Sequence, residues 1–253
     1  LFKICRDAGV VPFSSPFDSS AVDYLETLDA PMYKIASMET GDTALIKRVA
    51  ETGKPIIIST GATEWNEIEE LVRVVERVGN SDLTLLVCTS SYPSEPVDAH
   101  LRRIETLKKS FGVKVGLSDH TLNNNACLGA VALGASILER HFTDKMQRTG
   151  PDIVCSMDEK ACAELIVSSK EIWQMRGGQK VPAKEEQVTI DFAFATVCSI
   201  ASIKKGEKLS KENIWVKRPG TGKILAEHFN DIVGKIAVRD IENDEQLDFT
   251  DFE

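Results

Sequence analysis

The sequence predicts an α/β fold built on a parallel sheet, and two observations carry that prediction. Short apolar runs alternate with helix-length segments from residue 10 to about residue 175. The runs show little in–out alternation, which is typical of strands buried on both faces of a parallel sheet. Six such runs are present, at residues 10–13, 32–37, 55–60, 83–90, 113–118 and 136–142. Six strand–helix units suit a doubly wound sheet, whereas a (β/α)8 barrel would need two more.

The segments between the runs have the period of helices that pack on such a sheet. In residues 63–79, Ile68, Leu71 and Val75 fall on one face, and Gly79 is a stop signal. A second long helical pattern covers residues 158–178. Regular alternation of strands and helices with short connections therefore predicts parallel pairing.

Composition excludes several classes of function. The 253 residues are 42% hydrophobic and 27% charged, which suits one large domain, or one domain with a small appendage. The net charge is −9 without a basic run, so we expect no nucleic-acid partner. Apolar stretches are too short for a membrane span. The six cysteines lack paired spacing, which indicates reduced thiols in a cytosolic protein.

After Gly177 and Gly178 the chain changes character. A polar linker leads into a region without β–α rhythm. Residues 203–214 and 241–252 share a frame of Ile, three polar residues, Glu, a polar residue and Leu. This internal repeat predicts a small pseudo-symmetric β module.

Every apolar run ends in polar side chains, and the carboxyl ends of parallel strands form the site in such folds. These residues are Ser14 and Ser15; Lys34, Ser37 and Glu39; Ser59 and Thr60; Thr89, Ser90, Ser91 and Tyr92; Ser118, Asp119 and His120; and Glu139 and His141. The alternative is that strand ends are polar because loops begin there. Lys and His inside apolar runs are costly unless they are used, which favours a functional site.

His120 and His141 end two successive runs, so we expect both imidazoles at one rim of the sheet. Neutral imidazole suits Mn, Fe, Co or Zn, and two ligands leave positions for water and substrate. Asp119 and Glu139 are expected to orient the imidazoles. The alternative is a pair of hydrogen-bonded histidines without a metal.

Lys34 lies inside a run that is predicted to be buried. Such a lysine is either a Schiff-base nucleophile or the partner of an anion, and nearby serine hydroxyls favour a phosphate or carboxylate. The alternative is a lysine whose head reaches solvent at the rim. Asp152 follows the last run and could bind sugar hydroxyls, although Pro-Asp is also an ordinary turn signal.

Several segments together resemble the N-acetylneuraminate (sialic acid) synthase family. In order they are SSPFD, YKIASMET, PIIISTGAT, CTSSYP, GLSDHTLNNNACLGAVALGASILERHFTD, GPDIVCSM, DFAFAT and WVKRPGTG. The resemblance implies a (β/α)8 barrel at residues 1–180 that lacks its first two strands. It also implies a linker at 181–195 and a small antifreeze-like (SAF) domain of β-clip type at 196–253. A cytoplasmic, domain-swapped homodimer is implied as well.

The resemblance implies that phosphoenolpyruvate condenses with the open-chain aldehyde of N-acetylmannosamine and water, giving N-acetylneuraminate and phosphate. It implies a divalent metal, Mn²⁺ with Mg²⁺ or Co²⁺ as alternatives, on His120 and His141, which act with Lys34 in catalysis. Phosphoenolpyruvate-binding residues would be Ser15, Lys34, Ser37, Ser59 and Ser118. Sugar-binding residues would be Glu39, Ser90, Tyr92, Asp152 and Arg218.

Two departures from the family leave more than one function open. Ser90 stands where sialic acid synthases have Asn, so a legionaminic or pseudaminic acid synthase acting on a diacetamido sugar is an alternative. The family's catalytic glutamate lies on a strand before this chain begins, which leads to the hypothesis of a fragment that is inactive or poorly folded alone. An aldolase that uses Lys34 as a Schiff base is also compatible with the sequence, as is an inactive truncated paralogue.

Overall fold

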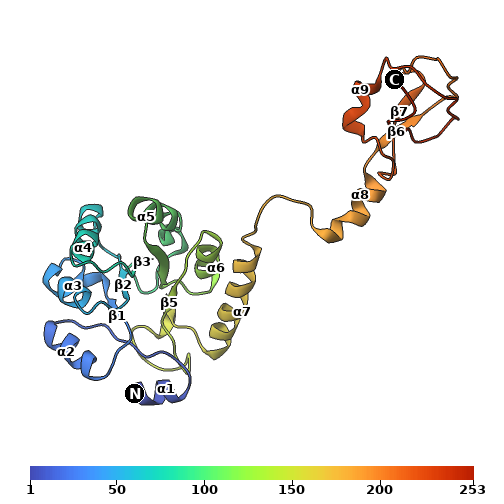
Figure 1. Ribbon diagram of the computed structural model, residues 1–253. Coiled ribbons are helices and arrows are strands. Elements are labelled where there is room, and N and C mark those ends of the chain that lie inside the picture. Colours follow the sequence, from blue (N-terminus) through green and yellow to red (C-terminus); the bar gives the residue numbers. More distant parts are fainter. The chain divides into compact units, whose positions relative to one another are not determined.

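The computed structural model describes residues 1–253 and divides them into two compact units, Leu1–Gly177 and Gly178–Glu253. The first unit is an open half-barrel, in which helices form an arc around the strands (Figure 1). This arrangement confirms the predicted α/β class.

The half-barrel contains one sheet of five parallel strands. They are β1 (Tyr33–Ile35), β2 (Ile56–Ser59), β3 (Leu83–Cys88), β4 (Lys114–Asp119) and β5 (Leu138–Arg140). Each strand pairs with the one before it, in the order β1-β2-β3-β4-β5. Sequential order is that of a barrel, because a doubly wound sheet reverses its order at a switch point.

The first predicted strand, at residues 10–13, is not a strand. The chain there makes a single parallel bridge, between Ser14 and Tyr33, in which the Lys34 amide donates to the Ser14 carbonyl at 3.3 Å. Pro12 and Pro16 flank the bridge and lack the N–H that a longer ladder needs. The prediction of six strand–helix units is therefore wrong by one strand, although Ser14 and Ser15 still reach the sheet.

The first unit contains seven α-helices, and the last six of them form the arc on the outer face of the sheet. They are α1 (Phe2–Asp7), α2 (Ser19–Thr27), α3 (Thr43–Ala50), α4 (Trp65–Arg77), α5 (Arg103–Phe111), α6 (Asn125–Ala132) and α7 (Glu159–Met175). In α4, Ile68, Leu71 and Val75 are buried as their spacing predicts, and Gly79 ends the helix region with φ of 83°. None of the helices is both long enough and apolar enough to cross a membrane.

The second unit contains α8 (Gln187–Ala193), β6 (Thr196–Ser199), β7 (Ile214–Lys217) and the short helix α9 (Phe229–Ile232). Strands β6 and β7 pair antiparallel. The internal repeat is built around Ile203 and Ile241, which exchange two backbone hydrogen bonds of 2.9 Å. Corresponding residues of the two copies thus meet at the centre of the module, which confirms its predicted pseudo-symmetry.

Equivalent side chains close equivalent turns in the two copies. The Glu207 carboxylate accepts from the Lys204 amide, and the Glu245 carboxylate accepts from the Glu242 amide, both at 2.9 Å. A glutamate three residues after the turn start therefore has the same task in each copy, which explains its place in the repeat.

Candidate active site

A cavity of about 250 Å³ lies at the carboxyl ends of β1, β4 and β5. Its lining residues are Ser15, Lys34, Ser118, His120, Glu139, Arg140 and His141. All of them except Arg140 belong to the polar strand ends that the sequence predicts to form a site. Because parallel strands end at one rim, residues far apart in sequence converge there.

The two histidines face each other across this cavity. His120 directly follows β4 and His141 directly follows β5, and their ring centroids are 5.4 Å apart. The Tyr92 ring centroid lies 4.1 Å from that of His120 and 5.7 Å from that of His141. Nδ1 of His141 lies 3.8 Å from Oδ2 of Asp152. The structure thus groups Tyr92 and Asp152 with the histidine pair.

The donor atoms of this pair fit an open metal site. Nδ1 of His120 lies 2.8 Å from the carbonyl oxygen of Thr89, and a carbonyl only accepts, so Nδ1 carries the proton in neutral imidazole. Nε2 is then the unprotonated nitrogen, which is the form that binds metal. No group of three or more His, Cys, Asp or Glu side chains is placed to hold a metal ion. A metal here would therefore take two imidazoles and complete its sphere with water or substrate.

Neither carboxylate that was expected to orient an imidazole directly pairs with a histidine nitrogen. Asp119 forms an ion pair with Arg140, with 3.3 Å between Oδ2 and Nε. Oε1 of Glu139 accepts from the Ser118 hydroxyl at 2.8 Å and lies 3.6 Å from Nζ of Lys34. The expectation was wrong because Asp119 points to the opposite face of its strand from His120, while Glu139 turns toward the cation of Lys34.

Lys34 is buried within the sheet, with 7% of its surface exposed. Nζ donates to the carbonyl of Ile35 at 3.1 Å and lies near Glu139 inside the cavity. The interpretation as a lysine reaching bulk solvent is therefore wrong. A buried ammonium group with one carboxylate neighbour keeps further donors for an anionic ligand.

The remaining serines expected to bind an anion lie beside this cavity, and they are not part of its lining. The hydroxyl of Ser59 is buried without a hydrogen-bond partner. The Ser37 hydroxyl accepts from the Gly61 amide at 2.9 Å. Ser90 lies near the same place, with its Oγ 3.9 Å from Sγ of Cys88. The Ser59 hydroxyl is therefore a buried polar group whose hydrogen-bonding capacity is unused.

Cys88 belongs to this region as well, although the sequence pattern does not distinguish it from an ordinary apolar strand residue. Burial raises the pKa of its thiol, but hydrogen bonding to His120 and Ser37 outweighs that effect and leaves the pKa below its ordinary value. Burial lowers the pKa of His120, whereas contacts with Cys88 and the Thr89 carbonyl raise it above its ordinary value overall. Each group thus stabilises the charged form of the other, and a metal on Nε2 of His120 would have to displace the proton that the charged form carries there.

None of the five expected sugar-binding residues lines the cavity itself. Tyr92 and Asp152 lie next to the histidine pair, and Ser90 lies next to Cys88. Glu39 follows β1 in a short 3₁₀ segment, and its Oε2 is buried without a hydrogen-bond partner. Arg218 belongs to the second unit, where it follows β7. The structure therefore places Arg218 on a different unit from the histidine pair.

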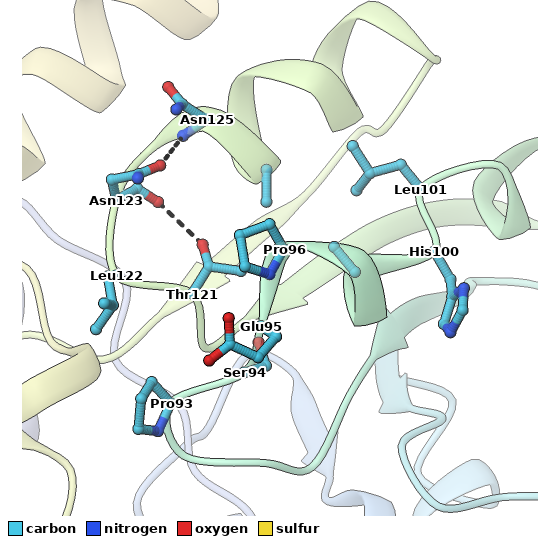
Figure 2. Close-up of a pocket in the computed structure, with 12 residues that line it drawn as sticks. Pro93, Ser94, Glu95, Pro96, His100, Leu101, Thr121, Leu122, Asn123 and Asn125 are labelled. Carbon is cyan, nitrogen blue, oxygen red and sulfur yellow. Dashed lines mark hydrogen bonds between the residues drawn. The ribbon is translucent and has the colours of Figure 1, made fainter.

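A further cavity, of about 480 Å³, lies between the loops after β3 and β4 (Figure 2). It is lined by residues 93–96 and 99–101 of one loop and by residues 121–123, 125 and 126 of the other. None of the site residues predicted from the sequence lines it. One wall is the segment that directly follows His120. Hydrogen bonds from Thr121 to the Asn123 carbonyl and from the Asn125 amide to the Asn123 side chain hold that segment in a defined conformation.

Comparison with known proteins agrees with this geometry. The NeuB family model matches residues 1–181, and the SAF domain model matches residues 198–253. The chain is 37% identical to the pseudaminic acid synthase of Helicobacter pylori, over 100% of this chain and 74% of that protein. It is also 37% identical to the N,N'-diacetyllegionaminic acid synthase of Campylobacter jejuni, over 96% and 73%.

A solved structure is similar as well. The N-acetylneuraminic acid synthetase of Leptospira borgpetersenii superposes with a TM-score of 0.71 at 32% identity. The match covers 75% of this chain and 66% of that one.

Proposed function

The chain belongs to the NeuB family of sugar-acid synthases, and we propose that it condenses phosphoenolpyruvate with the open-chain aldehyde of a 2-acetamido sugar. One observation carries the proposal: a buried lysine and two facing histidines share one cavity with serine hydroxyls. Such a set can hold an anion on one side and a metal with an aldehyde oxygen on the other.

The proposed reaction forms one bond between carbon atoms. C3 of phosphoenolpyruvate attacks the aldehyde carbon, and the aldehyde oxygen takes up a proton to become a hydroxyl. Water adds at C2, and phosphate leaves with its bridging oxygen. The products are a 2-keto sugar acid and inorganic phosphate.

The anion side rests on Lys34. Its ammonium group is buried, so its attraction for a phosphate or carboxylate is screened less than at a surface. Ser15, Ser37, Ser59 and Ser118 would add hydroxyl donors. Glu139 would keep the lysine head in place through the ion pair.

The metal side rests on the two histidines. When bound, a divalent metal, Mn²⁺ in our proposal with Mg²⁺ or Co²⁺ as alternatives, supplies a Lewis acid for the aldehyde oxygen. His120 and His141 would hold it, and the Thr89 carbonyl fixes the tautomer of His120. The Tyr92 ring contacts both imidazoles and would limit the access of water.

Two sugars are candidates for the second substrate, and both carry a 2-acetamido group. N-acetylmannosamine, which would give N-acetylneuraminate, is the substrate expected from the sequence. A diacetamido sugar is the second candidate, because the relatives at 37% identity carry the names of pseudaminic and diacetyllegionaminic acid synthases. We propose Glu39, Ser90, Tyr92 and Asp152 as sugar contacts, with Arg218 supplied by a second copy of the chain in a domain-swapped dimer.

The test is phosphate release from phosphoenolpyruvate against a panel of 2-acetamido and diacetamido sugars. It is run on this chain and on a form carrying any sequence that precedes Leu1 in its gene. Release with a single sugar class identifies the substrate. Absence of release with every sugar, from both forms and with Mn²⁺ present, would contradict the proposed reaction.

Two measurements separate the competing mechanisms. Arg218→Ala should raise KM for the sugar more than KM for phosphoenolpyruvate, and an equal rise would argue against a sugar contact. Borohydride treatment with pyruvate should leave Lys34 unmodified. Trapping of pyruvate on Lys34 would instead favour an aldolase that uses a Schiff base.

A further inference from the structure

We infer that the buried ion pair between Asp119 and Arg140 is a positioning device for the two histidines. It sets the spacing of His120 and His141 at which they hold a divalent metal. The inference rests on the metal site of the proposed function and assigns a task to two residues that the proposed reaction does not use. Both would act through the histidines, so they are positioning residues.

The register of the sheet places the pair beside the histidines. Asp119 and Arg140 are direct partners across β4 and β5, and each immediately precedes a histidine. Successive strand residues point to opposite faces, so Asp119 and Arg140 leave their strands on the side away from the imidazoles, although Arg140 still forms part of the cavity lining. Both side chains are about 2% exposed. An ion pair at this register position therefore fixes the distance between His120 and His141, which are the next residues along the two strands.

Arg140 also hydrogen-bonds to the segments that lie next to both histidines. One terminal nitrogen donates to Oδ1 of Asn124 at 2.7 Å, and the other donates to the carbonyl of Thr121 at 2.7 Å and to that of Cys155 at 3.3 Å. Thr121 follows His120, and Cys155 belongs to the 3₁₀ segment that follows Asp152. One guanidinium thus joins β5, the loop after His120 and the segment next to the residue that faces His141.

Asp119, which directly precedes His120, holds the same residue after His120 that Arg140 contacts. Its carboxylate accepts from the Thr121 amide at 3.0 Å, and its Oδ2 lies 3.1 Å from the Thr121 hydroxyl oxygen. Figure 2 shows how the same loop continues, with Thr121 donating to the carbonyl of Asn123 and the Asn125 amide donating to the Asn123 side chain. The residues before and after His120 are therefore both tied down, which leaves its ring little freedom.

Stability alone is a poor reason for such a pair. Taking two charges out of water costs several kcal/mol per ion, and apolar replacements of similar volume are often as stable. Here Nε of Arg140 has no hydrogen-bond partner, because its 3.3 Å contact with Asp119 lacks hydrogen-bond geometry. What apolar side chains cannot supply is the charge attraction across the two strand ends together with the directional hydrogen bonds from Arg140 to Asn124 and Thr121. Partners that orient metal ligands typically change metal affinity about 10–100-fold when removed.

The experiment measures the Kd for Mn²⁺ alone, from the free-ion signal in electron paramagnetic resonance, together with thermal unfolding of each variant. The main variant is the double replacement Asp119→Leu with Arg140→Met, which keeps the site filled and leaves no lone charge. Arg140→Lys retains the charge but loses the fork that reaches Asn124 and Thr121. Asn80→Ala is the matched control, since buried Asn80 donates to the carbonyls of Ala50 and Lys54 before β3, at the opposite end of the sheet.

We expect the double variant to bind Mn²⁺ about 10–100-fold more weakly than the parent, and Arg140→Lys to fall between them. Asn80→Ala should unfold at a lower temperature with a Kd within about twofold of the parent. Parent-like binding by the double variant, or equal weakening by Asn80→Ala, would overturn the inference. If the double variant does not fold, parent-like binding by Arg140→Lys overturns it and weaker binding supports it. A parent that binds no Mn²⁺ contradicts the proposed metal site itself, which is a different outcome.

Discussion

Gly61 provides the sharpest test of how the site is packed. A Cβ atom at this position would lie 2.3 Å from Oγ of Ser90, 2.9 Å from Sγ of Cys88 and 3.0 Å from Oγ of Ser37. The φ angle of Gly61 is outside the left-handed region, so alanine meets no backbone penalty there. Gly61→Ala therefore perturbs the side chains of the site and leaves the backbone of the loop unstrained.

The size of the effect follows from these contacts. The Ser90 hydroxyl would have to move by roughly 1 Å, and overpacking of this kind typically costs about 1–3 kcal/mol. Cys88 is only 5% exposed and has little room to retreat. Moving Ser37 would also weaken its hydrogen bond from the Gly61 amide, a contact of about 0.5–1.5 kcal/mol. We expect an unfolding free energy lower by about 1–3 kcal/mol.

Activity should fall beyond the loss of stability. If Ser90 contacts the sugar, loss of one hydrogen bond raises KM for the sugar by about threefold to tenfold. The assay combines urea unfolding with phosphate release at varied sugar concentration. Gly41→Ala is the control, since a Cβ there meets nothing within 4 Å and φ is again ordinary. A Gly61→Ala protein as stable and as active as Gly41→Ala would refute the packing argument.

Other parts of the structure give three more predictions. His141→Ala should abolish Mn²⁺ binding while the unfolding temperature stays within a few degrees; retention of parent-like Mn²⁺ affinity would exclude it as a ligand. Gly116→Ala should destabilise the half-barrel by about 3 kcal/mol or more, because its Cβ would lie 2.2 Å from the Ile137 carbonyl; urea unfolding measures this, and a change below about 1 kcal/mol would contradict it. Hydrogen bonding from Lys54 and Tyr33 holds the pKa of Glu26 below its ordinary value of 4.5. That contribution to stability is complete above pH 4.5 and is lost as the pH falls through the lower folded pKa, so Glu26→Gln should be less stable than the parent at neutral pH and equal to it in acid. Unfolding free energies measured across this pH range check the prediction, and a stability difference independent of pH would contradict the pairing.

Much of the fold could be predicted because the relevant signals are local. Unalternating apolar runs identify buried parallel strands, and the period in α4 identifies the face that packs on them. The error at residues 10–13 has a local cause as well, since Pro12 and Pro16 limit the ladder to one bridge at Ser14. The repeat in the second unit could also be predicted from local signals, because the glutamate that closes the turn of each copy lies within that copy.

The candidate site was only partly visible from the sequence. His120, His141 and Lys34 stand out because charged or polar residues are rare inside apolar runs. The partners of Asp119 and Glu139 could not be assigned, because a carboxylate can turn toward any cation that the sheet brings near it.

Most of the strand–helix order, the polar rim and the residues that we propose as metal and anion contacts could be predicted from the sequence alone, because each depends on neighbours along the chain. The tertiary structure was needed to show that Asp119 pairs with Arg140 and that Glu139 pairs with Lys34. These contacts join different strands. Their geometry depends on strand register and on which cation lies close to each carboxylate. Neither can be predicted from a single segment of the sequence.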